Sequence, residues 1–92
     1  MTIRRRIADL LAGRPHTMRD LSVALGIRER EVLDHLPHVA RSVPSPKRLR
    51  VSPAQCLECG FLFRKRERFS TPGKCPLCRS QRIHPPDFAI EG

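Results

Sequence analysis

Two short segments decide the fold of this chain: Cys56-Leu57-Glu58-Cys59 and Cys75-Pro76-Leu77-Cys78. They hold all four cysteines of the sequence, and fifteen residues separate them. Two thiolates that are two residues apart can bind one metal ion from a single tight turn, a zinc knuckle, and two such turns complete a tetrahedron of sulfurs. The spacing therefore predicts a structural zinc site in a β-ribbon, with Cys56, Cys59, Cys75 and Cys78 as its ligands.

Two other uses of paired cysteines fit the sequence less well. Disulfides require an oxidising compartment, and nothing in the sequence directs export. The basic start of the chain, residues 1–13, lacks the apolar run of an export signal because Asp9 interrupts it. A thioredoxin-like redox pair would need one Cys-x-x-Cys motif rather than two at ribbon spacing.

Length and composition limit the fold and the partners. Ninety-two residues make one domain, or two very small ones that share a core. With four Phe and no Trp or Tyr, the core is mostly aliphatic, and a structural metal is a usual source of the missing stability. The formal charge of +9 favours a polyanionic partner. No apolar run approaches the length of a membrane span, so we expect a cytoplasmic protein without a membrane partner.

Capping signals predict two helices in the first part of the chain. Apolar residues recur at helical spacing over residues 3–12, and Thr2 precedes them as an N-cap. Thr17, followed by Asp20 three residues later, forms a variant of the capping box and starts a second helix. Gly26 ends that helix, because glycine adopts the left-handed conformation of a helix terminus at little cost.

A third helix is predicted from about Arg28, with Val32 and Leu36 facing inward. Pro37 removes one backbone hydrogen bond and clashes with the preceding turn. We therefore expect this helix to kink or end near Leu36, with a last irregular turn that reaches Arg41.

The stretch 18–36 is the second informative motif, because it predicts a helix, a short glycine turn and another helix. In a helix-turn-helix this arrangement lets the second helix enter the major groove of DNA. Ser22 lies where a small residue lets the two helices approach closely. Val32 with His35-Leu36 resembles the Val-x-x-His-Leu pattern in recognition helices of winged-helix regulators. Three acidic residues of the third helix oppose binding to DNA phosphates: Glu29, Glu31 and Asp34.

The remainder of the chain predicts short strands. Residues 48–52 alternate between polar and apolar side chains, and Pro53 closes that strand. Further short strands are expected at 61–63, 82–84 and 88–90, with the two cysteine pairs between the first and the last strand.

With its elements in this order, the chain resembles small prokaryotic winged helix-turn-helix transcriptional regulators that carry a rubredoxin-like zinc ribbon. The resemblance implies an α+β fold: a three-helix winged helix-turn-helix, residues 1–53 and 87–92, with a zinc ribbon, residues 54–86, inserted in the wing hairpin. The strand around Leu49–Val51 would pair with Phe88–Ile90. Rubredoxin-like knuckles commonly carry glycine after the second cysteine. Gly60 fits, whereas Arg79 departs from the pattern, so a less regular second turn is expected.

The resemblance implies a regulator of transcription that binds double-stranded DNA, and dimerisation would suit it. The candidate DNA contacts lie on the third helix, the wing and the ribbon: Arg28, Arg30, His35, Lys47, Arg48, Arg50, Arg64, Lys65 and Arg66. Basic groups of this kind give salt-sensitive contacts to the phosphate backbone. No catalytic motif or small-molecule substrate is evident, and four cysteine ligands close the coordination of a zinc ion, so we do not expect an enzyme.

Two alternatives remain open. In the first, the ribbon is a protein-protein interaction module that docks an acidic partner, which the acidic third helix favours. In the second, less favoured, the four thiolates bind iron for electron transfer, as in rubredoxins. The strong basic charge and the helix-turn-helix half argue against iron.

Overall fold

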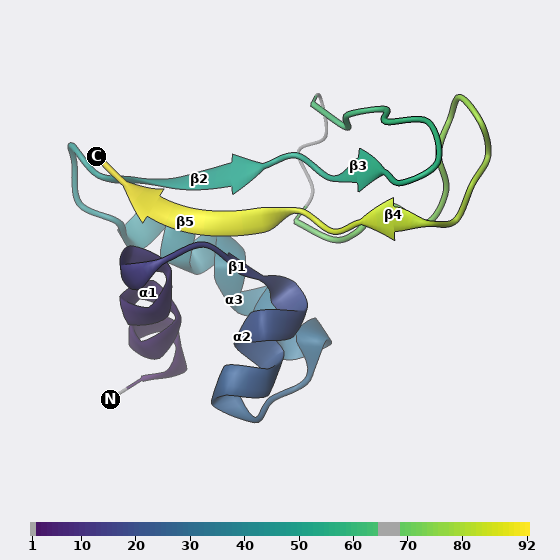
Figure 1. Ribbon diagram of the computed structural model, residues 1–92. Coiled ribbons are helices and arrows are strands. Elements are labelled where there is room, and N and C mark those ends of the chain that lie inside the picture. The colour runs from purple at the N-terminus through teal and green to yellow at the C-terminus, as the bar shows by residue number, and fades with distance from the viewer. Residues whose placement is uncertain (1, 65–68) are drawn as a thin grey trace.

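The computed structural model describes residues 2–64 and 69–92, in which helices cover one side of a small sheet and a ribbon extends from the end of that sheet (Figure 1). The described part of the chain measures 43 × 29 × 19 Å. Its elements follow the order α1 (Ile3–Gly13), β1 (His16–Thr17), α2 (Met18–Leu25), α3 (Glu29–Ser42), β2 (Arg48–Ser52), β3 (Gln55–Cys56), β4 (Ile83–His84) and β5 (Asp87–Glu91).

The first two helices begin at the predicted caps. In α1, the Thr2 hydroxyl accepts a hydrogen bond from the Arg5 N–H at 3.2 Å. In α2, the Asp20 N–H donates to the Thr17 hydroxyl at 3.1 Å, and the Thr17 N–H donates to the Asp20 carboxylate at 3.0 Å. Each bond satisfies a backbone or side-chain group that the first turn of a helix otherwise leaves without a partner. The predicted capping box is confirmed.

The turn between α2 and α3 also follows the prediction. Gly26 adopts φ 66° and ψ 33°, the left-handed conformation of a helix C-terminus. The half-buried Ser22 hydroxyl donates to the Ile27 carbonyl across the turn. This bond fixes the direction in which the chain leaves α2 and enters α3.

Of the two outcomes expected at Pro37, an end of the third helix near Leu36 is wrong, because α3 continues through Pro37 to Ser42. Leu36 and Val39 lie on either side of the proline, and both side chains are buried in the core. Proline leaves the helix without one backbone donor, but burial of these apolar neighbours holds the segment helical. Tertiary packing has overridden the local signal.

Three antiparallel strands form the main sheet in the order β1-β5-β2. The predicted pairing of the strand around residues 49–51 with residues 88–90 is confirmed, since Leu49 lies opposite Ile90 and Val51 opposite Phe88. The short strand β1 pairs with the other edge of β5 and was not expected from the sequence. The chain therefore passes through the ribbon between two neighbouring strands of one sheet.

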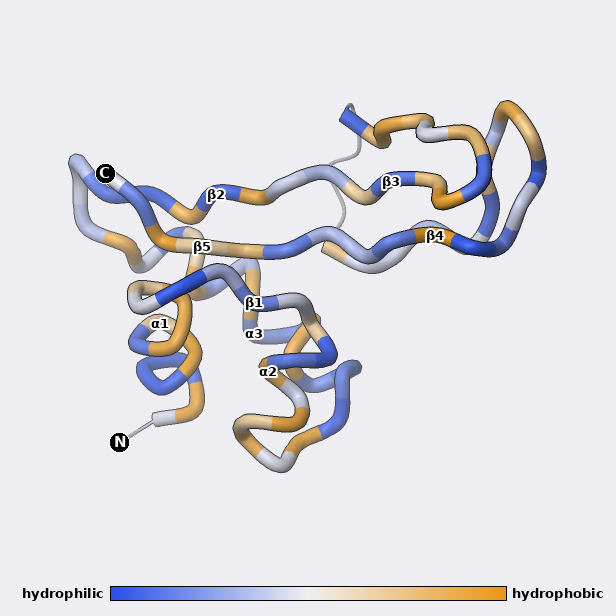
Figure 2. Tube along the Cα trace, in the orientation of Figure 1, coloured by the Kyte–Doolittle hydropathy of each residue, from blue (hydrophilic) through white to orange (hydrophobic). Residues whose placement is uncertain are grey.

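The core lies between the helices and the middle of β5, where Figure 2 shows hydrophobic segments next to one another. Phe88 is fully buried and brings an aromatic ring from the sheet to the helices. No cysteine belongs to this cluster of described residues, which consists of Ile7, Leu11, Met18, Leu21, Val32, Leu36, Val39 and Phe88. The helical part thus has a core of its own, apart from the metal site.

The ribbon pairs β3 with β4, with Gln55 opposite His84 and Cys56 opposite Ile83. The strand expected at residues 61–63 is wrong as an element, because within the described part of the chain this segment has a single bridge, which joins Leu62 to Gln55. Cysteine knuckles constrain the chain on both sides of the ribbon, which leaves little room for regular strands. Among the helices of the described residues, none combines the length and the apolar character needed to cross a membrane.

Candidate functional site

Each cysteine pair sits on a tight turn closed by the same backbone hydrogen bond. The Gly60 N–H donates to the Cys56 carbonyl at 3.0 Å, and the Arg79 N–H donates to the Cys75 carbonyl at 2.9 Å. Gly60 has φ 80°, and Arg79 has φ 61°, in the same left-handed region. The expectation of a less regular second turn is wrong, because the arginine adopts the conformation for which glycine is usually selected.

The two turns bring the four sulfurs together, with every pair of Sγ atoms within 4.8 Å. The Sγ atoms of Cys56 and Cys78 lie 3.5 Å apart, and those of Cys59 and Cys75 lie 3.6 Å apart. A zinc–sulfur bond of about 2.3 Å in a regular tetrahedron places the sulfurs about 3.8 Å from one another. A disulfide requires only about 2.05 Å between sulfurs, so these distances fit a metal ion instead.

The four thiols do not hold their protons equally. The pKa of Cys56 is lowered to about 6, chiefly by a hydrogen bond from the Cys59 N–H and further by one from the Glu58 N–H, while burial acts in the opposite direction. The Ser80 N–H lowers the pKa of Cys78, but burial and the three neighbouring thiols together raise it to about 12. A divalent ion relieves this competition, because metal binding replaces the protons and stabilises all four thiolates.

Backbone bonds and one ion pair tie the two knuckles to the ribbon. The Cys56 N–H donates to the Phe61 carbonyl at 2.9 Å, and the Leu57 N–H donates to the Arg82 carbonyl at 2.8 Å. Arg82 Nη1 lies 2.9 Å from Glu58 Oε1, between the segments that carry the two pairs. Cys56 and Cys75 are buried, whereas Cys59 and Cys78 lie at the surface.

The candidate DNA contacts of α3 lie at two places on that helix. Arg28 is its N-cap residue and Arg30 belongs to its first turn, and both side chains are exposed. His35 lies half-buried further along and accepts a hydrogen bond at Nδ1 from Arg4 of α1. This contact between helices was not foreseen from the sequence, since 31 positions separate the two residues.

The candidates near the sheet form a separate group. Lys47 and Arg48 are exposed at the start of β2, and Arg50 of the same strand pairs with Glu91 of β5 at 3.1 Å. Figure 1 shows the turn that precedes α3 at the end of the molecule away from the sheet. The structure therefore does not gather the residues of the α3 N-terminus and those of β2 into one patch. Arg64 is exposed on the ribbon, whereas Lys65 and Arg66 lie outside the described residues.

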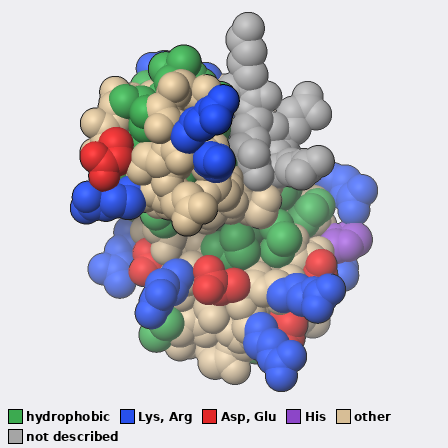
Figure 3. Space-filling model, turned by 90° about the vertical axis from the view of Figure 1, so that its right-hand side faces the viewer, with side chains coloured by type: hydrophobic (Ala, Val, Ile, Leu, Met, Phe, Trp, Pro, Cys, Tyr) green, Lys and Arg blue, Asp and Glu red, His purple; other side chains and the backbone are tan. Residues whose placement is uncertain are grey.

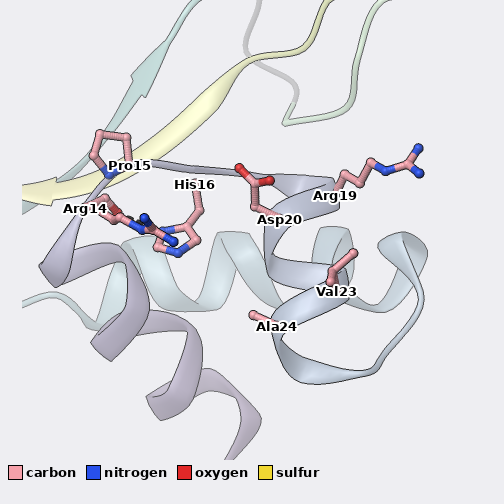
Figure 4. A pocket seen from close by; sticks show the side chains of 7 residues that line it. All are labelled: Arg14, Pro15, His16, Arg19, Asp20, Val23 and Ala24. Carbon is pink, nitrogen blue, oxygen red and sulfur yellow. Dashed lines mark hydrogen bonds between the residues drawn. The ribbon is translucent and has the colours of Figure 1, made fainter.

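A shallow hollow of ≈ 570 Å³ lies beside α2, where the chain passes from α1 into β1 (Figure 4). His16 is buried there, and its Nδ1–H donates to the Arg14 carbonyl at 2.8 Å. Arg19 points away from His16 and Arg14 in this view. Because the remaining lining mixes charged and apolar groups, the hollow indicates no particular ligand. The lining residues are Arg14, Pro15, His16, Arg19, Asp20, Val23 and Ala24.

A three-helix α+β unit with a four-cysteine ribbon defines a small zinc-ribbon protein. Comparison of the sequence with protein families identifies the family of this chain. The family described as "PF0610-like, N-terminal" matches residues 2–51. The family described as "PF0610 rubredoxin-like zinc beta-ribbon domain" matches residues 53–92. The chain belongs to the PF0610-like family, and its cysteines form the structural zinc site of a rubredoxin-like ribbon.

A solved structure has the same arrangement. The solution NMR structure of protein PF0610 from Pyrococcus furiosus is 28% identical to this chain, with a TM-score of 0.79. The match covers 98% of this chain and 89% of that one. No curated protein matches the chain.

Proposed function

We propose that this protein is a DNA-binding regulator of transcription, in which α2 and α3 act as a helix-turn-helix and the β2–β5 pair acts as the wing. The observation that carries the proposal is the combined placement of these elements. A glycine turn, closed by the hydrogen bond from the Ser22 hydroxyl to the Ile27 carbonyl, sets α3 against α2. The next element, β2, pairs with β5 over five residue pairs. A formal charge of +9 supports a polyanionic partner.

The acidic residues of α3 have a role that is compatible with this proposal. Glu29 and Glu31 lie in the first turn of the helix, where carboxylates interact favourably with the positive end of the helix dipole. Figure 3 shows acidic and basic side chains interspersed over the helical part of the molecule, below the ribbon. We assign the contacts to DNA phosphates chiefly to the basic residues at β2, and the contacts to DNA bases to Arg28 and Arg30.

Arg48 and Arg50 provide a test with a matched control on one strand. Arg50 already pairs with Glu91, whereas Arg48 forms no ion pair with any carboxylate of the described residues. The logarithm of DNA affinity falls with the logarithm of salt concentration, by about 0.9 for each neutralised phosphate. Arg48→Gln should reduce this slope by about 0.9, and Arg50→Gln should reduce it less.

The experiment is random-site selection on double-stranded DNA with the zinc-loaded protein at two salt concentrations, followed by anisotropy titrations of both variants. An enriched motif and the unequal slopes support the proposal. If no motif is enriched at either salt concentration, the proposal of a DNA-binding regulator is wrong. If both slopes equal that of the wild type, the assigned contacts at β2 are wrong.

The proposal extends to the location, the class and the oligomeric state of the protein. We infer a cytoplasmic binding protein rather than an enzyme, because four sulfur ligands occupy the tetrahedral positions that a catalytic zinc would need to share with water. A homodimer would let two copies of α3 address two half-sites. Sedimentation of the protein with and without the selected DNA tests this stoichiometry.

One observation favours a second function, a protein-protein interaction module. Leu57 and Leu77, one in each cysteine pair, are 58% and 71% exposed. Figure 3 shows hydrophobic side chains gathered at the top of the ribbon. If Leu57→Ser and Leu77→Ser leave DNA affinity unchanged but abolish the biological effect of the protein, the ribbon serves a protein partner.

A further inference from the structure

Four basic side chains meet where α1 packs on α3. Arg4 Nε of α1 donates to His35 Nδ1 at 3.3 Å, and Arg41 Nη2 donates to His38 Nδ1 at 3.0 Å. The direction of both bonds is fixed, because a guanidinium group has donors and no acceptor. Each imidazole therefore accepts at Nδ1, is neutral, and carries its proton on Nε2, where it can donate to a further group. We call these four residues the α1–α3 basic cluster.

No carboxylate of the described residues forms an ion pair with this cluster. In residues 2–64 and 69–92 the ion pairs join Arg5 to Asp9, Arg50 to Glu91 and Arg82 to Glu58, and none includes Arg4 or Arg41. Arg4 lowers the pKa of His38, and burial, Arg41 and His35 act in the same direction. Hence the charged groups acting on His38 from both helices are cationic.

The acidic residues of α3 do not change this balance. Glu31 and Asp34 share the helix with both histidines, but neither forms a hydrogen bond or an ion pair with the α1–α3 basic cluster in the described part of the chain. The two arginines consequently keep guanidinium donors available for a negatively charged group.

The position of Arg4 in its helix is electrostatically unfavourable. Arg4 is the second residue of α1, and the first turn of this helix contains no acidic residue. A cation there faces the positive end of the helix dipole, which is unfavourable. Arg41, in the last turn of α3, is favourably placed by the same rule. An anion held at the α1–α3 basic cluster would offset the unfavourable charge at Arg4.

We propose that the α1–α3 basic cluster is a binding site for a phosphate group, held by the guanidinium groups of Arg4 and Arg41 and by the Nε2–H donors of His35 and His38. The planar guanidinium group of arginine can donate two parallel hydrogen bonds to the oxygens of one phosphate group. Hydrogen bonds from charged donors are also stronger than those between neutral groups. The phosphate can belong to a free phosphate ion or to the backbone of a nucleic acid. The site does not rest on the DNA-binding proposal, because inorganic phosphate tests it alone.

The experiment is a titration of the zinc-loaded protein with inorganic phosphate at constant ionic strength, followed by NMR signals of the histidine rings and backbone amides. We expect saturable shifts at His35, His38 and the first turn of α1. Shifts that do not saturate, or that equal amounts of chloride reproduce, would overturn the proposal.

Matched variants assign the site to its residues. Arg4→Gln and Arg41→Gln together should weaken phosphate binding by about tenfold or more, because two charged donors are lost. Arg5→Gln removes a neighbouring charge that pairs with Asp9, and it should change affinity little. His35→Asn with His38→Asn removes the two ring N–H donors and should also weaken phosphate binding. An equal loss in Arg5→Gln would show a general charge effect and refute the site.

A short DNA duplex distinguishes the two sources of phosphate. If the cluster holds the nucleic-acid backbone, the duplex displaces inorganic phosphate and the double arginine variant weakens both ligands. If it holds a free phosphate ion, the duplex does not compete, yet saturable phosphate binding persists. Each of these two results supports the site and identifies the source of its phosphate. If the protein does not bind DNA at all, the titration with inorganic phosphate still tests the site.

Discussion

Gly60 and Arg79 hold equivalent places in the two zinc knuckles, and their backbones share the left-handed conformation, with φ 80° and φ 61°. Only glycine adopts this conformation without a steric cost from Cβ. The second knuckle thus carries strain that the first avoids, while both turns keep the same closing hydrogen bond.

Replacing Arg79 by glycine should therefore stabilise the zinc-loaded protein by about 0.5–1 kcal/mol, since relief of strain exceeds the added entropy of the unfolded chain. Urea unfolding at saturating zinc measures the change. The reverse substitution, Gly60→Ala, is the control: the nearest atom to the added Cβ would be Gln55 Nε2 at 3.9 Å, so only backbone strain acts. It should destabilise by about 1 kcal/mol. Unchanged stability in both variants would contradict this account.

Zinc removal should affect the two halves of the molecule unequally. The core between the helices and β5 contains no cysteine among the described residues, whereas the knuckle turns surround the four sulfurs. In small zinc domains the binding energy of the metal is largely folding energy. A chelator should abolish amide protection at Cys56, Gly60 and Arg79 but preserve it in α1 and α3.

Hydrogen exchange followed by NMR, before and after chelation, measures this difference, and elemental analysis of the purified protein should find zinc. Restoring zinc should restore protection of the knuckle amides, and the variant Cys59→Ser should behave like the chelated wild type. Equal loss of protection in the helices would show that the metal holds the whole fold together. A red protein containing iron would overturn the assignment of zinc.

The features that the sequence predicted correctly are those set by neighbouring residues. Thr17 and Asp20 satisfy each other's backbone groups within one turn, and the cysteine spacing alone implies a common metal. Pro37 misled the prediction because burial of residues distant along the chain maintains α3. The pairing of Arg4 with His35 could not be predicted, since it depends on how α1 packs against α3. Strand β1 is too short to leave a periodic signal.

The capping box of α2 makes stability depend on pH. The Thr17 N–H is the main cause that lowers the pKa of Asp20 below its ordinary value of 3.8. The folded state therefore favours the carboxylate, and this stabilisation is fully present above the unfolded pKa. It is lost as the pH falls through the lower pKa of the folded protein. Asp20→Asn removes the titrating group, so the stability difference from the wild type should be largest near neutral pH and shrink in acid.

Urea unfolding at a series of pH values between about 2 and 7 measures this dependence. Thr17→Ala is the informative control, because it removes the capping hydroxyl but keeps the backbone N–H that binds the carboxylate. It should lower stability by about 1 kcal/mol and weaken the pH dependence only in part, because the hydroxyl contributes less than the Thr17 N–H to the lowered pKa of Asp20. If Asp20→Asn instead lowers stability by a constant amount over the whole range, the carboxylate contributes through its shape and hydrogen bond rather than through its charge.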